Sequence, residues 1–135
     1  MEILIDFPGG VKVNAHFSNF TVPTDQPVRD GGEGSAPSPF DTFLASIATC
    51  AGYYVVSYCQ QHGLPTEGIQ LIQRTNRNRE TGLIDRIEVE IQVPSTFPEK
   101  YIPSLVRSAE LCTVKKHLEH PPKIEVSTQV VNPVS

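Results

Sequence analysis

Apolar and polar residues alternate along several stretches of the chain, which is typical of β-strands with one buried face. In residues 11–17 the odd positions are apolar and the even positions are mostly polar, and Pro8-Gly9-Gly10 before them indicates a turn. Residues 2–23 are therefore predicted to form short strands. The clearest alternation runs over residues 83–93, and Thr81-Gly82 before it predicts a hairpin turn between two strands.

A long apolar segment in the middle of the chain carries the end signals of a helix. Ser38 is a suitable N-cap, Pro39 suits the first helical position, and Asp41 places a carboxylate in the first turn. Gly63 suits a left-handed C-terminal position, and the proline two residues later cannot continue the helix. We expect a helix that ends near His62 and that is apolar on all sides, as a buried central helix is.

The remaining elements complete a mixed α and β pattern. A second helix is predicted from about Pro103 to His120, with Cys112 on its core-facing side, and residues 123–131 alternate as a last strand would. Four prolines and three glycines make residues 23–39 a loop. The order of strands, long helix, two strands, helix and strand predicts an α+β fold with helices packed on antiparallel sheet.

Composition limits the classes of protein to consider. With 135 residues and 39% apolar content, the chain fits a single domain over residues 1–135 that needs no metal or disulfide for its core. A net charge of −4 argues against nucleic-acid binding, which favours clustered Lys and Arg. The longest apolar stretch, residues 43–59, is interrupted by Ser, Thr, Gly and Tyr. We therefore expect a soluble, cytoplasmic protein without a membrane span.

The three cysteines are the candidates for chemistry. Their spacing matches neither a zinc ribbon nor a disulfide framework, which leaves packing or redox chemistry. Cys50 and Cys112 lie on the two predicted core helices, where a thiol pair can reduce peroxides, although buried free cysteines commonly serve only as small apolar residues. Cys59 follows Cys50 by nine positions, half a turn around the helix, and is expected to pack in the core.

Two segments around these cysteines resemble a known family. SPFDTFLASIATCAGYY (residues 38–54) and AELCTVKKHL (residues 109–118) together are similar to the cysteine regions of the OsmC/Ohr proteins, thiol-dependent peroxidases that act on organic hydroperoxides. The resemblance covers most of the chain. It implies an intertwined homodimer in which antiparallel sheets wrap two long central helices, with both cysteines of a site facing a pocket near the subunit interface.

The resemblance also implies a mechanism. Cys50 would attack the peroxide as a thiolate and become a sulfenic acid, and Cys112 would condense with it to a disulfide. This chemistry requires no metal, flavin or other cofactor. An external dithiol, from a lipoylated protein or a thioredoxin-like protein, would regenerate the thiols.

The sequence indicates the two thiols more clearly than the group that would activate Cys50. Cys50 lies about three turns into its helix, too far from that helix's N-terminus to use its dipole, so a cation from elsewhere is expected to lower its pKa. Arg29 is the candidate, because the family's catalytic arginine comes from the N-terminal part of the chain. Lys115 and Lys116 are alternatives near Cys112, although all three cations are also typical of a solvated surface.

The sequence departs from the best-characterised branch of the family at two positions. That branch has an acidic residue ten positions before the first cysteine, where this chain has Phe40, and the nearest carboxylate is Asp41. Thr113 follows the second cysteine, where proline is common. We therefore assign the chain to a less-characterised OsmC-like branch, with Asp41 as a second candidate catalytic residue.

Aromatic residues near Cys50 are candidates for a substrate pocket. Their spacing would allow them to line or cap a pocket beside the thiol and favour an apolar peroxide over hydrogen peroxide; they are Phe40, Phe43, Tyr53 and Tyr54. Packing in a dimer core explains the same residues equally well.

Two other functions remain open at this stage. The fold would also suit a non-catalytic dimeric module that binds a small apolar or acidic ligand, with the cysteines only filling the cavity wall. A purely structural dimer is the third interpretation, although it does not explain two core cysteines placed as in the family.

Overall fold

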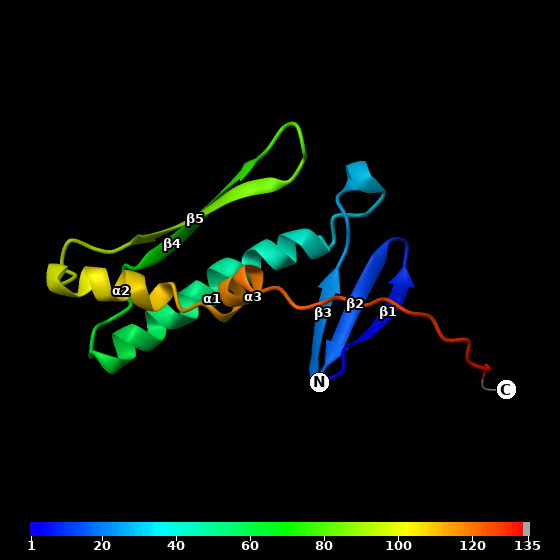
Figure 1. The fold of residues 1–135 in the computed structure, drawn as a ribbon, viewed down its shortest axis with the longest axis horizontal. Helices are drawn as coiled ribbons and strands as arrows, with labels where there is room; N and C mark the ends of the chain where they lie inside the picture. The colour runs from blue at the N-terminus through cyan, green and yellow to red at the C-terminus, as the bar shows by residue number, and fades with distance from the viewer. Residues whose placement is uncertain (134–135) are drawn as a thin grey trace.

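The computed structural model describes residues 1–133 as an elongated molecule with a small sheet at one end and a helical layer at the other (Figure 1). Both sheets are antiparallel, which confirms the α+β class predicted from the sequence. The elements in chain order are β1 (Leu4–Gly9), β2 (Lys12–Phe17), β3 (Phe20–Thr24), the 3-10 helix η1 (Val28–Asp30), α1 (Pro39–Gln61), β4 (Gln70–Arg77), β5 (Ile84–Gln92), the 3-10 helix η2 (Glu99–Tyr101), α2 (Ile102–Ala109) and α3 (Thr113–Glu119).

The first three strands form the N-terminal sheet in the order β1-β2-β3, as the alternation near the N-terminus predicts. Gly10 has a φ of 56° in the turn between β1 and β2, a conformation that glycine adopts without strain. All six residues of β1 are exposed, including Leu4 and Phe7. This sheet therefore leaves apolar surface open to solvent in the single chain.

The loop between β3 and α1 is organised around one buried carboxylate. Asp25 is only 1% exposed and accepts hydrogen bonds from the N–H groups of Gln26, Glu33 and Ser35 and from the Ser35 hydroxyl. Gly32 packs so tightly here that any Cβ would collide with the Gln26 carbonyl. The glycine-rich stretch is thus an ordered loop, tied to β2 by the ion pair between Lys12 and Glu33 at 2.8 Å.

Helix α1 has the ends that the sequence predicts. Ser38 Oγ accepts a hydrogen bond from the Asp41 N–H at 3.1 Å, Pro39 occupies the first turn, and Gly63 follows the helix with a φ of 63°. Ile47, Ala51 and Val55 recur at intervals of four residues and are buried on one face.

By length and composition α1 could cross a membrane, but such helices are also the core helices of soluble domains. Here α1 contacts α2, α3 and β4 (Figure 1), and its caps and its buried face assign it as the central helix of the domain.

The second sheet is the hairpin β4-β5, which was predicted from the alternation of residues 83–93. Asn78 organises its turn, because its side-chain oxygen accepts hydrogen bonds from the N–H groups of Glu80 and Thr81. Gln73 lies opposite Val89 and Leu71 lies opposite Ile91, so these side chains share one face of the hairpin, the face that packs on the helices.

The predicted second helix from Pro103 to His120 is wrong as a single element. The structure has two short helices, α2 and α3, separated by residues 110–112. The break occurs because the Cys112 backbone is extended, with φ −46° and ψ 122°, and its sulfur caps α3. No glycine or proline marks this break in the sequence. The prediction that Cys112 faces the core is confirmed, since it is 2% exposed.

The last strand predicted over residues 123–131 is also not observed. Residues 121–133 have no regular structure, and Ile124, Val126 and Val130 are exposed. A strand needs a neighbouring strand for its backbone hydrogen bonds, and within the described residues of one chain this segment has none. The predicted single domain runs to residue 135, and its last two residues lie outside the described part.

The hydrophobic core lies where α1 crosses α2 under the base of the β4-β5 hairpin. Its buried residues are Val55, Tyr58, Cys59, Phe97 and Leu105, and apolar side chains of both strands pack against them. Cys59 is fully buried in this cluster, which agrees with the packing role expected from its spacing. The core therefore fixes α1, α2 and one end of the hairpin relative to one another.

We predict that Asp25→Asn lowers stability at neutral pH. The Ser35 hydroxyl and the N–H groups of Gln26, Ser35 and Glu33 outweigh burial and hold the pKa of Asp25 well below the ordinary value of about 3.9. Because the pKa is lower in the folded state than in the unfolded state, the ionised carboxylate stabilises the fold at pH values above the unfolded-state pKa. This stabilisation is lost progressively as the pH falls from the unfolded-state pKa through the folded-state pKa.

Urea unfolding of the wild type, Asp25→Asn and the exposed control Asp30→Asn measures this contribution. The midpoint of Asp25→Asn should lie below both others at pH 7 and approach them toward pH 3. A difference that does not change with pH would contradict the role of the ionised carboxylate.

Candidate functional site

Cys50 and Cys112 meet where α3 packs against the middle of α1. Cys50 is partly buried on α1, and Cys112 is buried at the start of α3. The two thiols are close enough for the Cys112 thiol to stabilise the Cys50 thiolate. The structure thus brings together the two residues that the sequence analysis selected, although 62 positions separate them.

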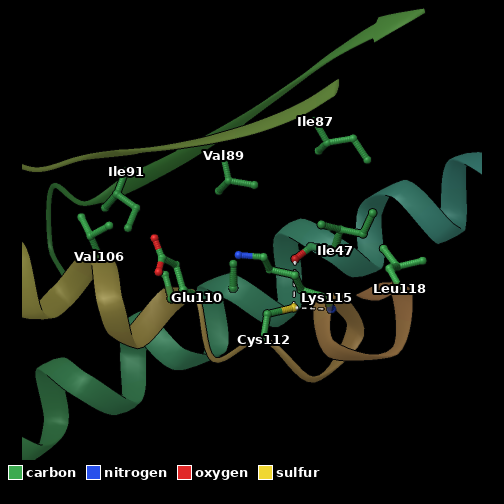
Figure 2. A pocket seen from close by; sticks show the side chains of 11 residues that line it. Ile47, Ile87, Val89, Ile91, Val106, Glu110, Cys112, Lys115 and Leu118 are labelled. Carbon is green, nitrogen blue, oxygen red and sulfur yellow. Dashed lines mark hydrogen bonds between the residues drawn. The ribbon is translucent and has the colours of Figure 1, made fainter. Parts of the chain in front are cut away.

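Cys112 is held by two backbone groups. Its sulfur accepts a hydrogen bond from the Lys115 N–H at 3.4 Å and donates one to the Ile47 carbonyl at 3.9 Å (Figure 2). The first bond caps α3, and the second connects α3 to α1. The buried cysteine is therefore fixed in orientation, as a resolving partner for a neighbouring thiol would need to be.

The environment of Cys50 favours its ionised form. Burial acts to raise the pKa of Cys50, but the N–H of Val114, the thiol of Cys112 and the N–H of Thr113 together outweigh it and lower the pKa. Thr113 and Val114 lie in the first turn of α3, where backbone N–H groups have no partner inside the helix. In the single chain, uncharged donors at this turn stabilise the thiolate, and the additional cation expected from the sequence stays a prediction.

The other two cysteines are shifted in the opposite direction. Burial raises the pKa of Cys112, and the nearby Cys50 raises it further, against the lowering effect of the N–H groups of Lys115 and Val114. Burial alone raises the pKa of Cys59. Of the three thiols, Cys50 is thus the one whose surroundings favour a nucleophilic thiolate.

An apolar cavity of about 290 Å³ opens beside Cys112, between the β4-β5 hairpin and the three helices (Figure 2). β5 contributes one wall through Ile87, Val89 and Ile91, and α1 contributes the opposite wall through Ile47 and Ala51. The other lining residues are Val106, Ala109, Glu110, Cys112, Lys115 and Leu118.

Two charged residues border this otherwise apolar cavity. The Lys115 side chain extends across it toward the side on which Glu110 lies (Figure 2), and both residues are exposed. The cavity can therefore take an apolar molecule that leaves a polar end at the solvent side. Within residues 1–133, no group of three or more metal-ligating side chains is found.

Arg29 and Asp41 lie away from the thiols in the single chain. The Arg29 side chain is 84% exposed and its nearest acidic partner is Asp30, at 3.8 Å. Asp41 is exposed in the first turn of α1, where its N–H serves the Ser38 cap. Neither is among the groups that shift the pKa of Cys50. Their catalytic roles stay predictions.

The four aromatic residues expected around Cys50 do not border the cavity beside Cys112. Phe40 and Phe43 pack on each other with ring centroids 5.7 Å apart, and both are at the surface. Tyr53 is exposed and packs edge-on against Tyr54. Of the four, Tyr54 comes nearest to the site, because its hydroxyl lies 3.1 Å from Thr113 Oγ1.

Sequence reasoning missed the walls of the cavity and the donors to Cys50. The alternation in residues 83–93 places Ile87, Val89 and Ile91 on one face, and this was the available signal for the β5 wall. The donors of Thr113 and Val114 are backbone groups, which no side-chain motif reports. They depend on the helix break before Thr113.

The family model described as OsmC-like protein matches residues 32–127, more than two thirds of the chain. No curated protein matches this chain. Several solved structures share the fold, one of them an osmotic stress-induced and detoxification response protein from Psychrobacter arcticus, which is 21% identical with a TM-score of 0.71 over 84% of this chain and 85% of the other.

Two further structures are more distant in sequence. An OsmC-like protein from Mycoplasma pneumoniae is 12% identical with a TM-score of 0.66, over 89% of this chain and 86% of the other. An organic hydroperoxide resistance protein from Legionella pneumophila is 17% identical with a TM-score of 0.53, over 87% and 89%. At these identities the structures establish the fold, and the matched family model establishes that the chain belongs to the OsmC-like protein family.

Proposed function

We propose that the protein is a thiol-dependent peroxidase that reduces organic hydroperoxides. The observation that carries this proposal is the proximity of a partly buried Cys50, whose pKa is lowered, to a buried Cys112 beside an apolar cavity. The OsmC-like family and the name of the Legionella pneumophila relative, an organic hydroperoxide resistance protein, support a role in peroxide chemistry.

The reaction follows from the two thiols. The Cys50 thiolate attacks the distal oxygen of the hydroperoxide, the O–O bond breaks, and the alkoxide takes a proton from solvent to leave as the alcohol. Cys50 is then a sulfenic acid. The Cys112 sulfur attacks it, water leaves, and a disulfide joins the two residues. The substrate gains two electrons and the thiol pair loses two.

The cavity favours an apolar substrate over hydrogen peroxide. Its walls are mainly Ile, Val, Ala and Leu side chains, which gain free energy by contact with an alkyl or aryl group and gain none from hydrogen peroxide. Its volume of about 290 Å³ lies at the small end of ligand pockets. A compact aryl or alkyl hydroperoxide such as cumene hydroperoxide is therefore a suitable test substrate.

We also propose that the working form is an intertwined homodimer. The single chain exposes 10638 Å², whereas a folded monomer of its mass exposes about 7,000 Å². Obligate dimers bury roughly 2,000 to 5,000 Å² or more in total. The excess on each chain, about 3,600 Å², is more than enough for its share of such an interface, and it includes the apolar side chains of β1.

The C-terminal segment supports the same proposal. Ile124, Val126 and Val130 keep a strand-like alternation but are 83%, 91% and 96% exposed in the single chain. A second copy of the chain would offer a strand edge that pairs with the backbone of the C-terminal segment, and an apolar surface that covers these side chains. In such a dimer two α1 helices would be central, and Arg29 and the aromatic residues of α1 could serve the partner's thiols.

The cycle requires an external reductant and a reducing compartment. All three cysteines are free thiols in the structure. We propose that a dithiol carrier, such as a lipoylated protein or a thioredoxin-like protein, reduces the Cys50–Cys112 disulfide in the cytoplasm, where protein thiols are kept reduced.

A non-catalytic binding module is the second candidate function. One observation favours it: the cavity is lined by Cys112, whereas Cys50 is not one of its lining residues. In that case the cavity would bind a small apolar molecule, and replacing Cys50 would leave the affinity unchanged.

Peroxide consumption by cysteine variants tests the proposed function. We predict that the reduced wild type consumes cumene hydroperoxide faster than hydrogen peroxide and loses two of its three thiols. Cys50→Ser should consume neither peroxide. Cys112→Ser should form a sulfenic acid, consume one equivalent and stop. Cys59→Ala, the matched control, should keep the wild-type rate. Retained activity in Cys50→Ser, or unchanged thiols in the wild type, would refute the proposal.

The pH dependence of Cys50 alkylation tests the role of the first turn of α3. Thr113→Pro removes one N–H at a position where the extended Cys112 backbone accepts a following proline. The pKa of Cys50 should rise, so iodoacetamide should react severalfold more slowly at pH 7 and at the same rate at high pH. Tyr54→Phe, which removes only the Tyr54–Thr113 hydrogen bond, should keep the wild-type profile. Identical profiles for wild type and Thr113→Pro would mean that this N–H does not act on Cys50.

Light scattering and a charge substitution in the C-terminal segment test the dimer. The wild type should have about twice the chain mass of 14.9 kDa. Val126→Glu should weaken the dimer by at least about tenfold, since burying a valine contributes about 1.5 kcal/mol or more per subunit. Ser127→Glu, next to it on the opposite side of the strand, should leave the mass unchanged. A monomeric wild type would overturn the dimer proposal.

A further inference from the structure

Gln73 is a polar side chain at the centre of an otherwise mainly apolar sheet face. In the antiparallel register it lies opposite Val89, between the pairs Leu71–Ile91 and Thr75–Ile87. Residues directly opposite each other share a face of the sheet. Ile87, Val89 and Ile91 are the residues of β5 that line the cavity. Gln73 therefore lies on β4, directly beside the β5 residues that form this wall of the cavity.

The amide of Gln73 links this sheet to α1. Its Nε2 donates a hydrogen bond of 2.9 Å to the carbonyl of Leu44, one helical turn before Ile47. Among residues 1–133 this is the one hydrogen bond that joins the β4-β5 hairpin to α1. It lies near the helix segment that carries Ile47 and Cys50.

The open end of the hairpin, away from its turn, is held by apolar packing. Leu71, Ile91 and Val93 pack against the core cluster around Val55 and Leu105. The sheet is thus attached to α1 at two levels, by apolar packing near Val55 and by the Gln73 amide near Leu44. The cavity lies between these levels, at Ile47 and Ala51 (Figure 2). The two attachments together set the distance between β5 and α1 over Cys112.

Stability alone does not account for glutamine at this position. Its Oε1 is buried and, within the described residues, accepts no hydrogen bond. A buried acceptor without a partner carries the full cost of its desolvation, which an apolar side chain of similar length avoids. Departures of this kind from local packing rules are expected next to functional sites.

We propose that Gln73 is a positioning residue that fixes the width of the apolar cavity and so determines selectivity for bulky apolar substrates. It acts through β5 and α1 and does not contact the substrate. Without its hydrogen bond, the hairpin end of the sheet is free to move relative to α1, and the cavity loses the fixed width that favours an aryl or alkyl group. The kinetic part of this inference rests on the peroxidase function proposed above.

The test compares Gln73→Met with Gln70→Met. Methionine matches glutamine in length but cannot donate to Leu44, and Gln70 is an exposed glutamine on the same strand that lies on the opposite face. In Gln73→Met, KM for cumene hydroperoxide should rise about five- to tenfold, with kcat and the rate with hydrogen peroxide unchanged. The melting temperature should stay equal or rise. Gln70→Met should match the wild type in every measurement.

A binding measurement separates this inference from the peroxidase proposal. Cumyl alcohol, the reduced product, should bind the thiol form of Gln73→Met about five- to tenfold more weakly than the wild type in a calorimetric or NMR titration. This comparison holds even if the wild type shows no turnover. Gln73→Thr, whose hydroxyl is too short to reach Leu44, gives a second variant with the same expected weakening. Unchanged binding in both variants, or equal weakening in Gln70→Met, would overturn the role of Gln73.

Discussion

The packing of the first turn of α3 against the middle of α1 is the contact on which the candidate site depends. It brings Cys112 to Cys50 and places the N–H groups of Thr113 and Val114 where they stabilise a thiolate. It also orients Cys112 through the Ile47 carbonyl and the Lys115 N–H. The interruption between α2 and α3 makes this possible, because a continuous helix would have these N–H groups bonded to its own carbonyls.

The second constraint is that one chain does not bury its own apolar surface. β1 and the C-terminal segment expose large apolar side chains, while the core around Val55 and Leu105 holds only the helices and the base of the hairpin. The proposed dimer would cover the exposed apolar side chains of both segments. It would also bring further residues to the thiols, among which Arg29 and the aromatic residues of α1 are the candidates that the sequence offers.

The parts of the fold that follow local rules could be predicted from the sequence. Ser38 and Gly63 mark the ends of α1, and strict alternation marks β5. The thiol pair was identified through its resemblance to a family. The helix break at Cys112 could not be predicted, because the sulfur caps α3 and no glycine or proline signals the change. The last strand was predicted from a real alternation, but a strand forms only where a neighbouring strand pairs with it.

The two cysteines of the site could be predicted from the sequence, but the groups that set the pKa of Cys50 could not. Cys50 and Cys112 carry the family pattern, whereas the donors that lower the pKa of Cys50 are backbone groups whose position depends on tertiary packing. Gln73 likewise looks like an ordinary strand residue until its amide is seen to reach the Leu44 carbonyl.

Mass spectrometry of peptides prepared without reductant, after reaction with one equivalent of cumene hydroperoxide, would show which cysteines react together. We expect a disulfide between Cys50 and Cys112 of the same chain, with Cys59 still a thiol. Three unmodified thiols, or a disulfide that involves Cys59, would contradict it.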